Sequence, residues 1–287
     1  MAYTTLIDTE ALAAGLGSGL VIADCRYDLN DESWGLAQYR AGHIPGAVYV
    51  SLGHDLAGTK TGTNGRHPLP SLEAIEATFS RLGIGAGTQV VAYDQDSGMY
   101  AARLWWMLRY AGHDAVAVLD GGWAKWLREG RPTRDGDERN APATFKAAPR
   151  ESWRLTAGDV EQILSDRSAV LVDARSPERY EGQTEPIDRV PGHIPGARNL
   201  HFRDNLAHDG TMLPPDALAR RFAPLLDGRR AEELVMYCGS GVTACHNLLA
   251  LEHAGVSGAR LYPGSWSEWS SDPSRPVESG PERATSD

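Results

Sequence analysis

The sequence predicts an α/β fold built from two tandem domains of one kind, each a mainly parallel sheet flanked by helices. Three observations lead to this prediction. Four motifs repeat in the same order, short β-rich runs alternate with helical patterns in each half, and the length of 287 residues is about twice that of an ordinary domain. Because open parallel sheets bind ligands outside the carboxyl ends of their strands, we expect the functional residues there.

The internal repeat is the strongest of these observations. Its four pairs are 21–26 with 170–175, 41–47 with 191–197, 90–94 with 234–238, and 120–126 with 263–269. A period of this length predicts duplicated domains instead of a solenoid of short repeats. The two copies differ at one informative position, because Asp94 stands in the first copy where Cys238 stands in the second.

Each half contains four apolar runs with the length and composition of buried strands. They are Leu20–Asp24, Val48–Leu52, Val90–Asp94 and Ala115–Leu119 in the first half, and Ala169–Asp173, Ala197–Leu200, Leu234–Tyr237 and Ala259–Tyr262 in the second. A helical pattern follows the third run of each half, at Met99–Tyr110 and Thr243–Ala254. A glycine soon after each pattern, Gly112 or Gly255, marks the end of the helix.

These elements divide the chain into four parts. We expect an N-terminal domain without the cysteine over 1–135, a linker over 136–152, a C-terminal catalytic domain over 153–271 and a flexible tail over 272–287. The tail is rich in serine, proline and charged residues, a composition that is typical of poorly ordered segments.

Composition limits the compartment and the partners. With 41% hydrophobic and 23% charged residues, the chain has enough apolar material for two cores. A net charge of −10 argues against a nucleic acid or an anionic membrane as partner. No apolar run is long enough for a membrane span, and the first residues lack a signal-peptide pattern, so a cytoplasmic location is the default expectation. Three cysteines without regular spacing form neither a disulfide framework nor a zinc motif.

Cys238 is the candidate nucleophile. It opens a short turn between a predicted strand and a predicted helix, whose other residues are Gly239, Ser240, Gly241, Val242 and Thr243. The backbone N–H groups of such a turn and the N-terminus of the helix favour a thiolate. The alternative is a small buried hydrophobe, the usual state of a free cysteine, and the two glycines of the turn argue against it.

Taken together, the paired Gly-His-Ile-Pro-Gly-Ala motifs, the Asp-x-Arg strand ends, the Cys-Gly-Ser-Gly-Val-Thr turn and the Gly-x-Trp-x-x-Trp endings resemble a tandem-domain rhodanese over nearly the whole chain. The resemblance implies a sulfurtransferase that moves a sulfane sulfur from a small anionic donor through a persulfide on Cys238. The acceptor would be cyanide, a thiol or a thioredoxin-like protein. Backbone amides from Gly239 to Thr243 would stabilise the charged sulfur, and no metal or organic cofactor is needed.

The identity of the donor depends on a few charged positions. The turn is most similar to that of the 3-mercaptopyruvate sulfurtransferases, whereas typical thiosulfate enzymes carry basic residues directly after the cysteine. Arg179 matches the substrate-binding arginine of the family, with a surface arginine as the alternative. A second substrate arginine of the mercaptopyruvate enzymes falls near Ile187 here, with Arg189 two residues on, which weakens that assignment. Because Gly239 and Ser240 are neutral, 3-mercaptopyruvate is the favoured donor and thiosulfate the alternative.

Ser240 is a second candidate catalytic residue. Mercaptopyruvate enzymes are thought to pair the corresponding serine with a histidine and an aspartate of the N-terminal domain. His67 and Asp55 lie in about the right segment, although their spacing does not match cleanly and exposed loop positions are the alternative. His43 and His193 are interpreted as structural, because their motif also occurs in the half that lacks the cysteine.

Two other functions compete with this interpretation. A dual-specificity phosphatase needs a longer loop that is closed by an arginine six residues after the cysteine, where this chain has Ala244. A carrier that delivers its persulfide to a protein partner would need the same turn as a small-molecule transferase. Saturable turnover with cyanide or a small thiol would separate the carrier from the enzyme.

Overall fold

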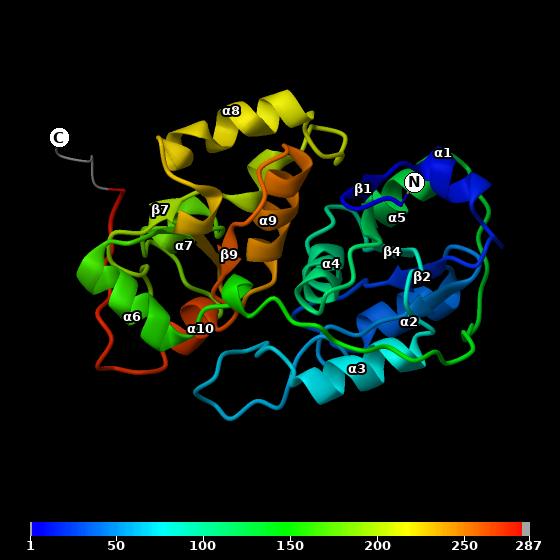
Figure 1. The fold of residues 1–287 in the computed structure, drawn as a ribbon, viewed down its shortest axis with the longest axis horizontal. Helices are drawn as coiled ribbons and strands as arrows, with labels where there is room; N and C mark the ends of the chain where they lie inside the picture. The colour runs from blue at the N-terminus through cyan, green and yellow to red at the C-terminus, as the bar shows by residue number, and fades with distance from the viewer. Residues whose placement is uncertain (1, 283–287) are drawn as a thin grey trace. The chain divides into compact units, whose positions relative to one another are not determined.

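The computed structural model describes residues 2–282, which form two compact units (Figure 1). The N-terminal unit consists of residues 2–58, 69–150 and 206–212, and the C-terminal unit of residues 59–68, 151–205 and 213–282. The loop 59–68 therefore comes from the first half of the sequence and belongs to the second unit. The loop 206–212 makes the reverse exchange.

The N-terminal unit is built on a parallel sheet with the strand order β1-β5-β4-β2-β3. Its strands are β1 (Leu6–Ile7), β2 (Val21–Asp24), β3 (Ala47–Tyr49), β4 (Val90–Tyr93) and β5 (Val116–Leu119). Its helices are α1 (Thr9–Ala14), α2 (Trp34–Ala41), α3 (Leu72–Arg81), α4 (Ala101–Tyr110) and α5 (Gly122–Arg128). Side chains of α1 and α5 join one face of the sheet in a buried apolar core, and α4 packs against β4 and β5. The central strands β2, β4 and β5 are buried and apolar up to Asp24 at the end of β2, as expected for strands covered on both faces.

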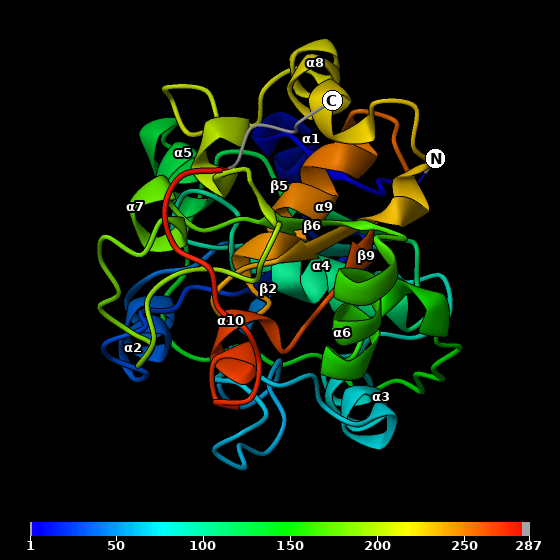
Figure 2. The same cartoon turned by 90° about the vertical axis from the view of Figure 1, so that its left-hand side faces the viewer.

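The C-terminal unit repeats this plan with a parallel sheet of order β7-β6-β8-β9. Its strands are β6 (Val170–Asp173), β7 (Arg198–Asn199), β8 (Leu234–Tyr237) and β9 (Arg260–Leu261). Its α-helices are α6 (Ala157–Asp166), α7 (Pro177–Tyr180), α8 (Pro215–Leu226), α9 (Thr243–His253) and α10 (Ser265–Trp269), and its 3-10 helices are η1 (Glu151–Trp153), η2 (Phe202–Asn205) and η3 (Ala231–Glu233). In Figure 2, α8 and α9 lie on one side of this sheet and α6 and α10 on the other. The predicted fold class is confirmed in both halves.

The repeated motifs make the same contacts in both units. Asp24 with Arg26, and Asp173 with Arg175, form a buried ion pair at the end of β2 or β6, with Nη2 to Oδ2 distances of 2.5 and 2.6 Å. Each of these arginines donates to the carbonyl of the glycine that precedes the motif histidine, at 2.7 Å, and lies over a tryptophan of the Gly-x-Trp ending. The two motif histidines each bond a backbone carbonyl through Nδ1 and stack on a tyrosine, which supports their structural interpretation.

The segments outside the sheets are more firmly attached than their composition suggests. Residues 272–282 were expected to form a flexible tail, but the backbone of Glu278 pairs with His193 in an antiparallel bridge, and Arg275 bonds a carboxylate of α6. The repeat explains this difference, because the chain after α5 bridges His43 in the same way. The rest of the predicted tail, 283–287, lies outside the described residues.

The predicted linker runs along the N-terminal unit without regular secondary structure. The backbone N–H groups of Ala143 and Ala148 donate to carbonyls of Ser80 and Ala111, both at 2.9 Å. These bonds fix its path as far as Arg150, where the N-terminal unit ends. Within residues 2–282, no helix combines the length and the apolar character that crossing a membrane would require.

Candidate functional site

Cys238 lies directly after β8, in the middle of the C-terminal sheet and at the carboxyl end of its strand. Its side chain is buried, with 2% of the residue surface exposed. The next turn closes tightly because Gly241 has a φ of +72°, and a Cβ there would lie 2.3 Å from the carbonyl oxygen of Pro263. Only glycine fits this position. The helix α9 then begins at Thr243, so the turn has no room for the longer phosphatase loop.

The turn also leaves donors available. The backbone N–H groups of Ser240, Val242, Thr243 and Ala244 have no acceptor among the described residues. Two of these groups belong to the first turn of α9, where the helix dipole adds a partial positive charge. An anion beside Cys238 would therefore meet several unpaired donors.

Ser265 fixes the backbone of Cys238. Its hydroxyl accepts the N–H of Cys238 at 3.1 Å and donates to the carbonyl of Tyr262 at 2.9 Å. Ser265 is fully buried and adopts a φ of +55°, which is uncommon for a residue other than glycine. The N-terminal unit has Gly122 at this position, with a φ of +54°. Ser265 thus adopts a strained backbone conformation at the position where its hydroxyl accepts the N–H of Cys238.

Ser240 and His67 are brought together by the loop 59–68. The Nδ1 atom of His67 lies 2.9 Å from Oγ of Ser240, and both residues are buried. The loop is fixed by α10 and the residues just after it, because the N–H of Arg66 donates to Oγ of Ser267 at 3.0 Å and the hydroxyl of Ser271 donates to the carbonyl of Thr63 at 3.1 Å. Figure 1 and Figure 2 both show this loop next to α10.

Asp55 belongs to the N-terminal unit. Its carboxylate accepts the N–H of Ser51 at 2.8 Å and pairs with Arg81. These contacts give the carboxylate a structural role without His67. The predicted pairing of Asp55 with His67 therefore stays a prediction.

Arg179 lies on α7, where its side chain is already paired. Its Nε and Nη2 atoms donate to Glu185, with Nη2 to Oε1 at 2.7 Å, and Nη2 also lies 3.4 Å from Oδ2 of Asp188. Burial would raise the pKa of Glu185, but the hydrogen bonds from Arg179 and from backbone N–H groups hold it below its usual value. Glu185 is therefore an anion that occupies one edge of the guanidinium of Arg179.

Arg66 is a second cation at this turn. Its Nη2 atom lies 2.7 Å from the position that a Cβ of Gly239 would take, and the two terminal nitrogens of Arg179 lie 3.6 Å from the same point. Arg66 also pairs with Asp188. The turn is therefore neutral in sequence, but a guanidinium approaches it from another segment of the chain.

Two residues at the site escaped the sequence analysis. Arg66 directly precedes His67, but no feature of the sequence indicates that a guanidinium from this segment reaches the turn after Cys238. Ser265 had a usable signal, because the repeat aligns it with Gly122, and a serine in place of a glycine marks a change of role.

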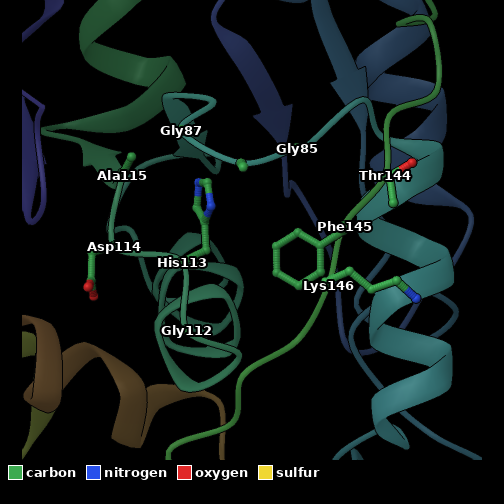
Figure 3. A pocket seen from close by; sticks show the side chains of 10 residues that line it. Gly85, Gly87, Gly112, His113, Asp114, Ala115, Thr144, Phe145 and Lys146 are labelled. Atoms are coloured by element: carbon green, nitrogen blue, oxygen red, sulfur yellow. The ribbon is translucent and has the colours of Figure 1, made fainter.

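The N-terminal unit contains a hollow of about 400 Å³ that is separate from the site around Cys238 (Figure 3). Its walls come from the stretches that precede β4 and β5 and from residues 144–146. It therefore lies at the amino edge of the sheet, away from the end of β4 where Asp94 follows. Its ionisable groups are engaged elsewhere: His113 bonds the carbonyl of Thr88, Asp114 pairs with Arg150, and Lys146 lies 3.6 Å from a carboxylate of α3. We assign no chemistry to it.

Comparison with known proteins agrees with the duplicated architecture. A family model described as a rhodanese-like domain matches residues 8–129 and 156–272. A Pseudomonas aeruginosa protein, provisionally named a 3-mercaptopyruvate sulfurtransferase, is 45% identical over 283 residues, which cover 98% of this chain and 100% of that protein. SseB of Mycobacterium tuberculosis, provisionally named a thiosulfate sulfurtransferase, is 41% identical over 280 residues, 95% of this chain and 96% of that protein. The crystal structure of SseA from Escherichia coli, described with 3-mercaptopyruvate sulfotransferases and a rhodanese fold, matches with a TM-score of 0.79 at 30% identity, covering 92% of this chain and 99% of that one.

Proposed function

The chain belongs to the rhodanese family of sulfurtransferases, and on this premise we propose that it takes the sulfur of 3-mercaptopyruvate onto Cys238 and passes it to cyanide or a thiol. One observation carries the proposal. A buried cysteine at the carboxyl end of a central strand is followed by a turn in which the N–H groups of Ser240, Val242, Thr243 and Ala244 lack acceptors among the described residues. This arrangement suits a sulfur that carries negative charge before, during and after transfer.

The reaction consists of two displacements at sulfur. The thiolate of Cys238 attacks the sulfur of the donor, so that a sulfur–sulfur bond forms and the carbon–sulfur bond breaks. The electron pair of the broken bond leaves on the enolate of pyruvate, which then takes a proton. The acceptor attacks the outer sulfur of the persulfide, the sulfur–sulfur bond breaks, and the thiolate of Cys238 returns.

Ser240 and His67 are proposed to handle the proton of the first step. Their contact of 2.9 Å allows the hydroxyl to pass a proton toward the leaving enolate while the imidazole holds or replaces it. Asp55 is proposed to orient His67, as the resemblance implied. The second step needs no proton at carbon, so the pair acts mainly on donor cleavage.

The donor is proposed from the charges around the turn. A carboxylate of 3-mercaptopyruvate suits an arginine such as Arg179, since guanidinium binds carboxylate through two parallel hydrogen bonds. The nearby carboxylates of Glu185 and Asp188 oppose a dianion such as thiosulfate more strongly than a monoanion. Thiosulfate is the alternative donor, and the names of the relatives include both.

The acceptor and the location are proposed from the sequence. Cyanide, a small thiol or a thioredoxin-like protein would each attack the outer sulfur of the persulfide. The cytoplasm would keep the three cysteines reduced, and all three are free in the described chain. A carrier that delivers sulfur only to a protein is the remaining alternative.

The test compares both donors with cyanide as acceptor, for the wild type and for Cys238→Ser. We expect kcat/KM for 3-mercaptopyruvate to exceed that for thiosulfate by more than about tenfold, which corresponds to about 1.4 kcal/mol of transition-state binding. A larger value with thiosulfate would overturn the donor, and activity that survives Cys238→Ser would overturn the mechanism. Absence of saturable turnover with cyanide or any small thiol would favour the carrier.

A further inference from the structure

We infer that Arg66, from the loop 59–68, binds the carboxylate of the donor and supplies the second cation of the donor site. The inference rests on the proposed function and names a residue that the resemblance did not indicate. The mercaptopyruvate enzymes that the turn resembles place their second arginine near a register that holds Ile187 here, with Arg189 two residues on, and the side chain of Ile187 is 43% exposed. The cation missing from that register is supplied by a different segment.

The position of Arg66 is the first argument. Its Nη2 atom lies 2.7 Å from where a Cβ of Gly239 would be, and the terminal nitrogens of Arg179 lie 3.6 Å from that point. Gly239 separates Cys238 from Ser240 in the chain. The two guanidinium groups therefore meet at the residue next to the nucleophile, and the absence of a side chain at Gly239 leaves them this room.

The hydrogen-bonding edges of the two arginines are the second argument. In Arg179, the edge formed by Nε and Nη2 is occupied by the carboxylate of Glu185. In Arg66, Asp188 bonds Nη1 instead, and Nε is buried without a partner in the part of the chain described. A buried N–H without an acceptor costs about 1–3 kcal/mol, which a bound carboxylate would recover. The edge of Arg66 that suits a bidentate carboxylate is thus the available one.

The local charges are the third argument. Three guanidinium groups and three carboxylates form one connected cluster, which consists of Arg66, Arg175, Arg179, Asp173, Glu185 and Asp188. Its formal charge is zero, so it adds no strong positive field that would favour a dianion. Asp188 bonds both Arg66 and Arg179 and holds the two cations at fixed positions. The site therefore recognises one carboxylate through directed hydrogen bonds.

The experiment compares Arg66→Met with the matched control Arg220→Met, an exposed arginine of the same unit. We expect Arg66→Met to raise both the KM for 3-mercaptopyruvate and the inhibition constant of pyruvate about 10- to 100-fold, because a hydrogen bond to a charged group contributes about 1.5–3 kcal/mol. Arg66→Lys should recover only part of this loss, since lysine keeps the charge without the bidentate edge. The rate at which enzyme loaded with sulfur reacts with cyanide should not change, because that step contains no donor.

The outcomes separate this inference from the proposed function. If the wild type and Arg220→Met turn over 3-mercaptopyruvate while Arg66→Met keeps their KM and pyruvate inhibition, Arg66 does not bind the donor. If the wild type itself does not turn over 3-mercaptopyruvate, the proposed donor is wrong. Should Arg66→Met fold poorly by circular dichroism, Arg66→Lys gives the same decision, because unchanged constants in that variant also contradict a bidentate contact.

Discussion

The turns after β4 and β8 occupy the same place in the two sheets and handle negative charge in opposite ways. After β4, the chain supplies its own anion. The carboxylate of Asp94 is fully buried and accepts the N–H groups of Asp96, Gly98, Tyr100 and Ala101, at 2.8–3.2 Å. After β8, Cys238 takes that place, and the N–H groups of Ser240, Val242, Thr243 and Ala244 have no acceptor among residues 2–282.

This difference shows how one fold can carry two versions of one site. In the closed version the backbone amides bond an internal carboxylate, and in the open version they stay available to a ligand. Carbonyls of both turns bond the helix that follows the next strand: Asp94 accepts the N–H of Trp123 and Cys238 that of Trp266, both at 2.9 Å. The backbone frame is thus preserved, while an internal carboxylate fills one cradle and a nucleophile borders the other. The surrounding charges differ as well. In the internal repeat, the neutral Asn30 of the first copy corresponds to Arg179 of the second.

Moving the cysteine between the two turns is the strongest test of this comparison. Cys238→Ser should lower sulfur transfer at least about a thousandfold, as expected for loss of a nucleophile. Adding Asp94→Cys to that variant should not restore activity, because the N-terminal turn has Asp96 where the other has Ser240 and lacks an arginine at the register of Arg179. Steady-state rates and the mass of the protein after exposure to donor measure both effects.

The outcome has a clear alternative. If Cys238→Ser with Asp94→Cys recovers more than about a tenth of the wild-type rate, a cysteine on this backbone frame is sufficient, and the charged residues around Cys238 are not required. Circular dichroism of both variants is the control, since Asp94 also bonds four backbone amides whose loss lowers stability.

The pair His67 and Ser240 sharpens the comparison, because only the C-terminal turn has it. Ser240→Ala and His67→Gln should each lower kcat with 3-mercaptopyruvate about a hundredfold, the size of a general acid–base contribution. The double variant should be little worse than either single one, since residues that act as a unit are not additive. Stopped-flow measurement of persulfide formation and of its reaction with cyanide assigns the loss to the first step.

His193→Gln is the matched control for this pair. Its ring bonds the carbonyl of Tyr180 at 2.7 Å and stacks on that tyrosine, so the variant should lower the free energy of unfolding without changing kcat of the folded enzyme. Additive losses in the double variant of His67 and Ser240 would show that the two residues do not share one task.

The sequence predicts those parts of this site that local structure determines. A strand, a turn with Gly241 and a helix follow one another in the chain, so Cys238 and its amides could be placed without tertiary information. Arg66 could not, because its contact with Gly239 depends on the loop 59–68 crossing to the other unit. The order of 272–282 was missed for a similar reason, since the partner of Glu278 is the distant His193. Composition describes a segment and carries no information about what it packs against.

The smallest predicted effect concerns the closed turn itself. Burial raises the pKa of Asp94 to about 6, although the hydrogen bonds from backbone amides lower it. A carboxyl whose folded-state pKa is raised binds its proton more tightly when folded, so its contribution to stability is complete below about pH 4 and is lost as the pH rises through about 6. The shift of about two units corresponds to about 3 kcal/mol.

Asp94→Asn should therefore flatten the change in the free energy of unfolding between pH 4 and pH 7, as measured by urea denaturation. Asp96→Asn, an exposed change in the same turn, should follow the wild type. Parallel curves for Asp94→Asn and the wild type would mean that folding does not raise the pKa of Asp94.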